Sequence, residues 1–245
     1  MKYIIVILGI FCLMCETPIP NKQSNQVRQI DFNSQSINQP SYFLVYIPQS
    51  AKTPAPVLYL LNGYGADPYA WASGADLQKA ADQFNMIIVS LTAWYNYYVD
   101  YETDSTQQKK KYESYVLEVI QIVDDNYDTG KTRAYRGISG ISNGGKGAIY
   151  IASRHPDMFV SASSLSGGFY PGYPPNYENL KGINLLIDVG ADDTSVLSNN
   201  RILHQYLLDN NIQHTYRETQ GGHDWRYWGA HYEEHFRFHS ESFQK

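Results

Sequence analysis

The sequence contains almost no cysteine, and none in its main body. Of its 245 residues only Cys12 and Cys15 are cysteines, and both lie in the N-terminal segment. A disulfide bond within the rest of the chain is therefore excluded, so side-chain packing has to stabilise the fold. Hydrophobic residues make up 43% of the sequence, which is enough for one sizeable core, and α/β folds of this length are commonly single domains.

Positive charge is also scarce. The formal net charge is −5, and the only basic run is Lys109-Lys110-Lys111. Without a basic stripe the chain does not offer the surface that nucleic acids or anionic membranes bind, so we expect no nucleic-acid partner. Tyrosine, in contrast, is abundant, with 22 residues. Its flat ring and polar hydroxyl suit sugar or phenolic ligands, although ordinary packing accounts for most copies.

The N-terminal apolar run is too short to cross a bilayer. It extends from Ile4 to Met14, follows a positive charge and ends before Glu16. This pattern is typical of a secretory signal, so we expect residues 1–15 to direct export. The protein is then secreted, periplasmic or lipid-anchored at the cell surface. A lipid on Cys15 is the alternative to cleavage, although the residues before it are larger than those of lipoprotein signals.

Strand-like and helical segments alternate along the rest of the chain. Residues 16–40 are polar and are expected to form a tether that leads into a pair of strands. Continuous apolar runs such as 57–61 are typical of strands covered on both faces. The expected strands are 42–47, 57–61, 86–91, 134–139, 159–165, 183–189 and 213–218, and the expected helices are 72–84, 107–126, 148–152, 196–210 and 225–245. The alternation predicts an α/β fold in one domain over 41–245, with a mostly parallel sheet flanked by helices on both faces.

The segment Gly140-Ile141-Ser142-Asn143-Gly144 lies between a predicted strand and a predicted helix. The pattern G-x-S-x-G in this setting is typical of a nucleophile elbow, a sharp turn that exposes the serine hydroxyl at the edge of a sheet. Glycines let the strand and the helix approach closely around the strained serine, because they carry no Cβ. The N-terminus of the helix directs its free N–H groups towards the group that the serine attacks. We therefore predict Ser142 as a nucleophile.

Partners for this serine follow in the order that α/β-hydrolases use, an acid and then a histidine. Both come directly after predicted strands, at the edge where α/β sheets bind ligands. A serine esterase needs a base to take the hydroxyl proton and a carboxylate to hold that base. His223 is the predicted base. Asp192 and Asp193 are the candidate acids, and Asp188, inside its strand, is a weaker one.

The negative charge that develops on the substrate oxygen needs two N–H donors. One is expected from the backbone of Asn143, the residue after the nucleophile. The other is expected from the loop 62–65, which follows an apolar strand. Because this chemistry needs no metal and no organic cofactor, we expect neither.

Several separated motifs resemble those of the esterase D group of α/β-hydrolases. Residues 59–65 (YLLNGYG) are similar to its oxyanion segment LLHGxGG, and residues 136–148 (RGISGISNGGKGA) to its elbow RxIxGxSMGGxGA. Residues 155–159 (HPDMF) and 164–167 (SLSG) match the segments that follow, and residues 214–225 (HTYRETQGGHDW) resemble HTYREWPGGHDW. The group includes S-formylglutathione hydrolases, tributyrin-type esterases, mycolyltransferases and the family-one carbohydrate esterases, which comprise feruloyl and acetyl-xylan esterases.

The resemblance assigns a role to each matching residue. It implies Ser142 as the nucleophile, His223 as the base and Asp193 as the acid, because the family's acid stands three residues after the glycine at the strand end. Asp192 stays the one-residue alternative. The implied oxyanion donors are the backbone N–H groups of Tyr64 and Asn143.

Two positions depart from the family pattern. Asn62 stands where the family often has His or Asp, and Asn143 replaces a frequent methionine. Because the oxyanion donors are backbone groups, neither change removes them. We expect both changes to alter the acyl pocket and hence the choice of substrate.

Two other motifs point to different functions. The elbow and Lys146 meet most of the P-loop pattern, but Gly147 stands where Mg²⁺ requires a hydroxyl, so nucleotide binding is not expected. Residues 231–235 match the zinc pattern H-x-x-E-H, but no distal third ligand follows them. We interpret these two histidines and His239 as a solvated helix face, without a metal.

The loop after Ala93 is crowded with aromatic residues, namely Trp94, Tyr95, Tyr97, Tyr98 and Tyr101. It follows a strand whose end faces the nucleophile, so it is either an aromatic wall for a feruloyl ring or a sugar, or a packed surface loop.

The sequence thus predicts a serine carboxylic-ester hydrolase that forms an acyl-enzyme. Export and the family resemblance favour acetyl or feruloyl esters of carbohydrates as its substrates, either small or polysaccharide-linked. Two alternatives are an acyltransferase of the same fold and a non-catalytic carbohydrate-binding protein on a hydrolase scaffold.

Overall fold

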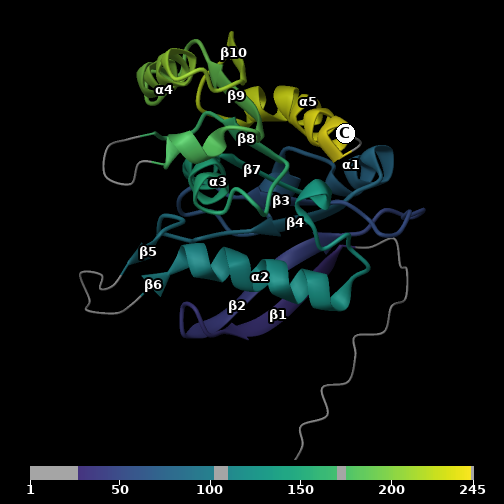
Figure 1. The fold of residues 1–245 in the computed structure, drawn as a ribbon. Helices are drawn as coiled ribbons and strands as arrows, with labels where there is room; N and C mark the ends of the chain where they lie inside the picture. Colours follow the sequence, from purple (N-terminus) through teal and green to yellow (C-terminus); the bar gives the residue numbers. More distant parts are fainter. Residues whose placement is uncertain (1–26, 102–109, 170–174, 244–245) are drawn as a thin grey trace, which may run out of the picture.

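The computed structural model describes residues 27–101, 110–169 and 175–243 (Figure 1). The export signal expected at 1–15, both cysteines and Lys109 lie outside these residues. Within the described part of the chain, no helix combines the length and the apolar character needed to cross a membrane.

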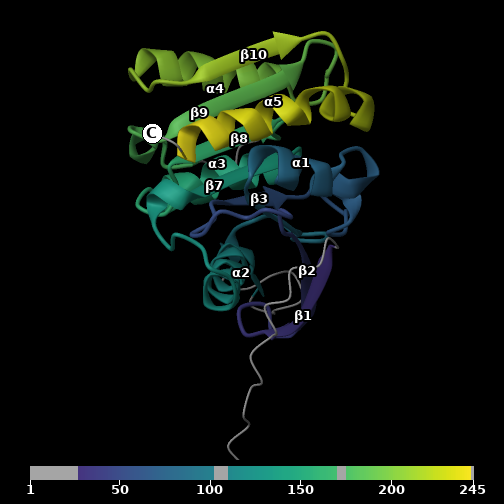
Figure 2. The ribbon, with the colours of Figure 1, turned by 90° about the vertical axis from the view of Figure 1, so that its right-hand side faces the viewer.

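A single large sheet forms the centre of the described structure (Figures 1 and 2). Its strands are β1 (Arg28–Ser34), β2 (Gln39–Tyr46), β3 (Val57–Leu61), β4 (Ile87–Leu91), β7 (Arg136–Ile141), β8 (Ser161–Leu165), β9 (Asn184–Gly190) and β10 (Thr215–Thr219). They lie in the order β1-β2-β4-β3-β7-β8-β9-β10. β2 is antiparallel to both of its neighbours, and all other neighbouring strands are parallel. The predicted mostly parallel sheet is therefore confirmed. A separate two-stranded ribbon pairs β5 (Asp100–Tyr101) with β6 (Lys110–Lys111).

Helices cover both faces of the sheet, as predicted (Figure 2). One face packs against α2 (Tyr112–Asn126), α3 (Asn143–Arg154) and α4 (Leu197–Asp209). The other face packs against α1 (Leu77–Phe84) and α5 (Trp225–Phe243). Short 3₁₀ helices lie in the connections, at Ala70–Ser73, Arg133–Tyr135 and Tyr177–Leu180.

Strand β3 is apolar throughout because both of its faces are covered. Val57, Tyr59 and Leu61 belong to the core under α2 and α3, whereas Leu58 and Leu60 belong to the core under α1 and α5. Successive side chains of a strand point to opposite faces, so a strand covered on both sides buries all of its side chains. β3 lies beside β7, and the loop that follows β3 therefore reaches the end of β7.

The tether predicted over residues 16–40 is wrong in its last part, because Arg28–Ser34 form strand β1 of the sheet. Along β1, exposed polar side chains alternate with Ile30 and Phe32, which pack against the core. This alternation is the signal of a strand with one covered face. The high content of Asn, Gln and Ser concealed it in the sequence.

The turn after β1 is attached to α2 through Glu118. Its carboxylate accepts hydrogen bonds from the Ser34 hydroxyl at 2.6 Å and from the N–H groups of Gln35 at 2.9 Å and Ser36 at 3.3 Å. Burial raises the pKa of Glu118, but these hydrogen bonds to its charged form outweigh burial, so the pKa is lower than usual.

Replacing Glu118 by Gln is expected to lower the free energy of unfolding by about 1 kcal/mol at neutral pH, because the charged acceptor is lost. The folded-state pKa lies below the unfolded one, so the contribution of Glu118 is present above the unfolded pKa of about 4.3 and is lost as the pH falls through the folded value. Urea unfolding of both proteins at neutral and at acidic pH measures this. The difference between them should shrink in acid, and exposed Glu241→Gln is the control that should show neither effect.

Candidate active site

A single residue, Ser142, separates the end of β7 from the start of α3. Its backbone has φ 53° and ψ −119°, a strained conformation for a residue with a side chain. Two glycines make the turn possible. A Cβ on Gly144 would lie 2.1 Å from the Leu61 carbonyl oxygen, and a Cβ on Gly140 would lie 2.2 Å from the Gly144 carbonyl carbon. The serine therefore stands on a strand–turn–helix junction, in the setting that the sequence pattern indicated.

Three side chains form one line of hydrogen bonds at this edge of the sheet. The Ser142 hydroxyl lies 2.8 Å from His223 Nε2, and His223 Nδ1 lies 2.6 Å from Asp193 Oδ2. The Asp193 carboxylate is fully buried, whereas the His223 ring is 30% exposed. Asp193 also accepts a hydrogen bond from the Ser195 N–H at 3.2 Å, which fixes the carboxylate. The line can move a proton from the serine to the imidazole while the carboxylate holds the ring.

The loops that carry Asp193 and His223 follow two neighbouring parallel strands, β9 and β10. Asp192 joins these loops. Its N–H donates to the Gly221 carbonyl at 2.9 Å, and its carboxylate accepts from the Gly221 N–H at 3.2 Å. Of the two adjacent candidate acids, Asp193 contacts the histidine and Asp192 fixes the spacing of the loops. Asp188 lies inside β9, as expected.

The loop after β3 lies against the serine. A Cβ on Gly63 would be 3.6 Å from the Ser142 Cβ. Among the described residues, the backbone N–H groups of Tyr64 and Asn143 donate to no protein acceptor. Asn143 is also the first residue of α3, where the helix dipole is positive. Two free amides beside a nucleophile have the arrangement of an oxyanion hole.

The side chains at the two departures from the family pattern have different surroundings. Asn62 is fully buried, and its amide donates to the Ser90 hydroxyl at 3.0 Å and to the Leu91 carbonyl at 2.9 Å. It holds the loop against β4, and its effect on the acyl pocket stays a prediction. The Asn143 side chain donates to the Asn96 carbonyl at 3.0 Å and attaches the elbow to the tyrosine-rich loop.

That loop has a buried part and an exposed part. Tyr98 is buried, and its hydroxyl donates to the Asn62 carbonyl at 2.9 Å. Tyr95 and Tyr97 are 71% and 43% exposed, and their ring centroids lie 5.8 and 5.9 Å from that of exposed Tyr64. We call Tyr64, Tyr95 and Tyr97 the tyrosine cluster. Packing thus explains Tyr98, whereas the tyrosine cluster presents aromatic surface next to the elbow.

The solvated face predicted for the histidines of α5 is wrong. His235 and His239 are fully buried between α5 and the sheet. His239 lies 2.7 Å from the Ser161 hydroxyl and 2.8 Å from the Ser163 hydroxyl. Burial lowers the pKa of both histidines, so both are neutral at neutral pH.

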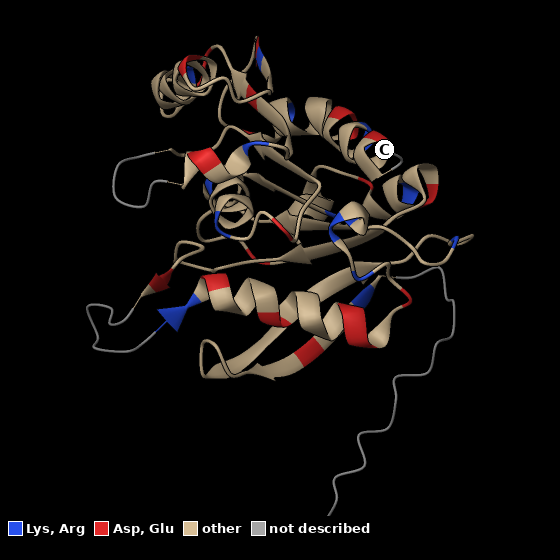
Figure 3. Ribbon diagram, in the orientation of Figure 1, with Lys and Arg blue, Asp and Glu red and all other residues tan. Residues whose placement is uncertain are grey.

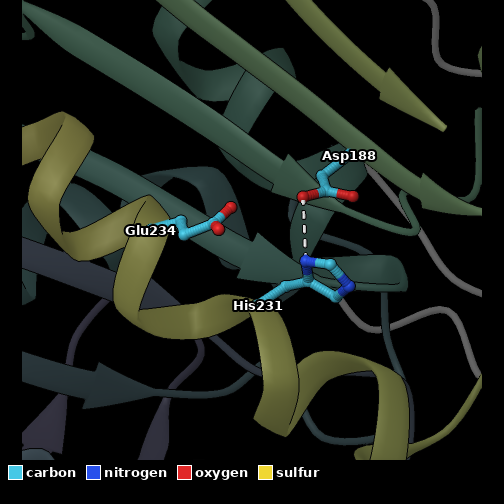
Figure 4. Close-up of side chains that lie close together, drawn as sticks. All are labelled: Asp188, His231 and Glu234. Atoms are coloured by element: carbon cyan, nitrogen blue, oxygen red, sulfur yellow. Dashed lines mark ion pairs between the residues drawn. The ribbon is translucent and has the colours of Figure 1, made fainter. Parts of the chain in front are cut away.

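The remaining part of the H-x-x-E-H motif meets Asp188 of β9. His231, Glu234 and Asp188 place their ligand-type atoms within 4.8 Å of one another (Figure 4). Arg217 of β10 already supplies a cation there. Its guanidinium pairs with Glu234 and lies 3.6 Å from the Asp188 carboxylate and 3.1 Å from His231 Nδ1. A metal ion would be repelled by this charge, so the cluster fits an arginine-centred ion-pair network better than a metal site.

Charged residues of both signs lie along α5, whereas α2 carries acidic residues and no Lys or Arg (Figure 3). In this view Lys and Arg form no continuous stripe on the described ribbon. This distribution agrees with the negative net charge of the sequence.

Comparison with known proteins gives consistent matches. The Esterase family model, described as "Putative esterase", matches residues 34–238. An acetyl esterase of Caldicellulosiruptor saccharolyticus is 24% identical over 258 aligned residues, covering 82% of this chain and 93% of that protein. A solved ferulic acid esterase has a TM-score of 0.78 at 24% identity, covering 89% of this chain and 98% of its own. The fluorophosphonate-binding serine hydrolase F of Staphylococcus aureus has a TM-score of 0.76 at 20% identity. The match covers 88% of this chain and 98% of that one. These structures establish that the chain has the α/β-hydrolase fold.

Replacing Gly144 by Ala is expected to lower the free energy of unfolding by about 1–3 kcal/mol, because the new methyl group meets backbone atoms that cannot move aside. Denaturant unfolding measures this effect. Gly222→Ala is the matched control, since a Cβ there would meet nothing within 4 Å. Equal stabilities of the two variants would show that the close approach at the elbow does not constrain the chain.

Proposed function

The chain belongs to the esterase family whose model matches residues 34–238, and we propose that it is a serine carboxylic-ester hydrolase that acts through an acyl-enzyme. The observation that carries this proposal is the line of hydrogen bonds from Ser142 through His223 to Asp193. It lies beyond the carboxyl ends of parallel strands, where α/β sheets bind their ligands.

In the first half of the reaction, His223 Nε2 takes the hydroxyl proton of Ser142 as Oγ attacks the ester carbonyl. The carbonyl oxygen becomes an oxyanion, and the N–H groups of Tyr64 and Asn143 bind it. One such donor typically contributes about 3 kcal/mol to transition-state stabilisation. The protonated imidazole is stabilised by the Asp193 carboxylate. It then donates its proton to the leaving alcohol, and the acyl group stays on Ser142.

In the second half, His223 takes a proton from water, and the resulting hydroxide attacks the acyl-enzyme through the same oxyanion geometry. The acid product leaves, and the serine regains its proton from His223. Because the N-terminus of α3 points at the reacting carbonyl, its dipole favours both oxyanions.

We propose acetyl or feruloyl esters of carbohydrates as the substrates. The support comes from the acetyl esterase and ferulic acid esterase among the similar proteins, and from the tyrosine cluster next to the elbow. Exposed tyrosine rings stack on phenolic rings and on the apolar faces of sugars, while their hydroxyls bond to polar groups. Export, expected from residues 1–15, is part of the same proposal, because polysaccharide esters lie outside the cell.

Two other functions use the same features. In an acyltransferase, an alcohol takes the place of water in the second half-reaction, and product analysis with added sugar acceptors separates the two activities. A non-catalytic carbohydrate-binding protein would use the tyrosine cluster alone. The hydrogen-bonded line argues against it, because a binding protein has no need of a buried carboxylate behind a histidine.

A fluorophosphonate probe tests the proposal, because it reacts with activated serines. We expect the purified protein to be labelled at Ser142, as located by mass spectrometry, and Ser142→Ala to be unlabelled. Hydrolysis of acetylated and feruloylated xylan fragments, measured as released acetate and ferulate, then identifies the acyl group. A folded protein that takes no label at Ser142 would overturn the proposal in favour of the binding protein.

The two adjacent aspartates give a matched pair of variants. Asp193→Asn is expected to lower kcat by about 10³–10⁴-fold, because an amide no longer holds the imidazole in the correct tautomer. Asp192→Asn keeps an oxygen that can accept from the Gly221 N–H and loses only the charge, so it should lower kcat by less than about tenfold. Steady-state kinetics on an activated acetyl ester, with circular dichroism as a folding control, compares them. The reverse ranking would assign the acid role to Asp192.

A further inference from the structure

Gly221 and Gly222, which precede His223, carry no side chain that could pack on the imidazole. The two hydrogen bonds of the ring go to Ser142 and Asp193, and bonds at Nδ1 and Nε2 lie in the plane of the ring. These bonds restrain the ring mainly within that plane, so a further contact of the ring with the protein helps to fix its tilt.

Trp228, in the first turn of α5, supplies this contact. Its ring centroid lies 5.1 Å from that of His223, and the two ring planes are inclined at 83°. Near-perpendicular packing at this distance is one of the arrangements that aromatic pairs prefer. Trp228 is 8% exposed, so its ring is held by protein on nearly all sides.

Trp228 is itself fixed by the core. Its indole N–H donates to the Ser166 hydroxyl at 3.2 Å, and the Ser166 N–H donates to the Asp188 carbonyl at 2.7 Å. Ser166 has φ 49°, so its place at the end of β8 is defined by an uncommon backbone conformation. On another side Trp228 packs on Trp225 at 5.4 Å and 86°, and Trp225 packs on fully buried Trp71 at 5.7 Å and 77°. A row of three indoles therefore connects the core to the histidine.

We propose that Trp228 is a positioning residue for the catalytic base. Its ring, anchored by Ser166, fixes the tilt of the His223 imidazole, so that Nε2 stays aimed at Ser142 while the ring gains and loses its proton. This inference rests on the proposed function, because it concerns the histidine of that reaction. Trp228 acts through His223 and does not itself contact the reacting atoms.

The test uses Trp228→Leu, which keeps an apolar side chain and removes the ring. We expect kcat to fall about 10- to 100-fold, the effect of a small misplacement of a reacting group. KM should change by less than about twofold, because no substrate contact is lost. The Nδ1 proton of His223, followed by NMR in the hydrogen bond to Asp193, should broaden because it exchanges faster with water. Loss of the indole ring current changes the chemical shift alone, and a purely structural role would leave the line width in place.

Tyr232→Leu is the matched control. Tyr232 is a buried aromatic residue of the same helix and packs on Phe236 at 5.4 Å. Its replacement should lower the melting temperature as Trp228→Leu does and leave kcat within about twofold of the wild type. Ser166→Ala keeps the indole ring and removes its anchor, so it should show a smaller loss of kcat, about three- to tenfold, and the same NMR change. Ser166→Ala also tests the inference if the Trp228→Leu protein does not fold.

Two results would overturn the inference. One is a folded Trp228→Leu protein, or in its absence Ser166→Ala, with an unchanged kcat and an unchanged line width of the Nδ1 proton. The other is an equal loss of kcat in Tyr232→Leu, which would reduce the effect to general stability. Failure of the proposed function is a separate outcome, since the unmodified protein would then take no fluorophosphonate label at Ser142. A labelled wild type with an unaffected Trp228→Leu rejects only the role of Trp228.

Discussion

The strained turn at Ser142 is the constraint on which the site depends, and backbone hydrogen bonds from three segments hold it. The Ser142 N–H donates to the Leu165 carbonyl at 2.9 Å, and the Ser142 carbonyl accepts from Lys146 and Gly168 at 3.2 Å each. These partners belong to the end of β8, to α3 and to the loop after β8. Strain at a single residue persists when its surroundings determine it several times over. The same close packing brings the Tyr64 and Asn143 amides to the serine, so nucleophile and oxyanion donors are placed together.

The acid and the base are placed by sheet topology. Because β9 and β10 are parallel neighbours, the loops that follow them leave the sheet side by side. The hydrogen bonds between Asp192 and Gly221 hold these two loops together. The histidine then has one hydrogen bond on each ring nitrogen and one aromatic contact on its ring. Asp193, Ser142 and Trp228 provide these from three different parts of the chain.

Sequence patterns were reliable where the determining residues are consecutive. The elbow, the apolar central strands and the order of serine, acid and histidine all have local signals, and the fold prediction from them is confirmed. The choice between Asp192 and Asp193 depends on the direction of one side chain in a turn, which no periodicity records. The strand β1 was missed because only Ile30 and Phe32 face the core. The buried histidines of α5 were misjudged because Ser161 and Ser163, which cover His239, come from a distant strand.

The position of β10 in the sheet has a consequence for how the molecule opens. β10 is an edge strand, so within the described sheet it pairs with β9 alone, whereas β7 has strands on both sides. Local unfolding starts where few bonds hold an element, and edge strands with partly exposed side chains meet that condition. The histidine is therefore carried by a more weakly held unit than the serine. A transient detachment of this edge would separate His223 from Ser142 while the elbow stays folded, so activity would be lost before the centre of the sheet opens.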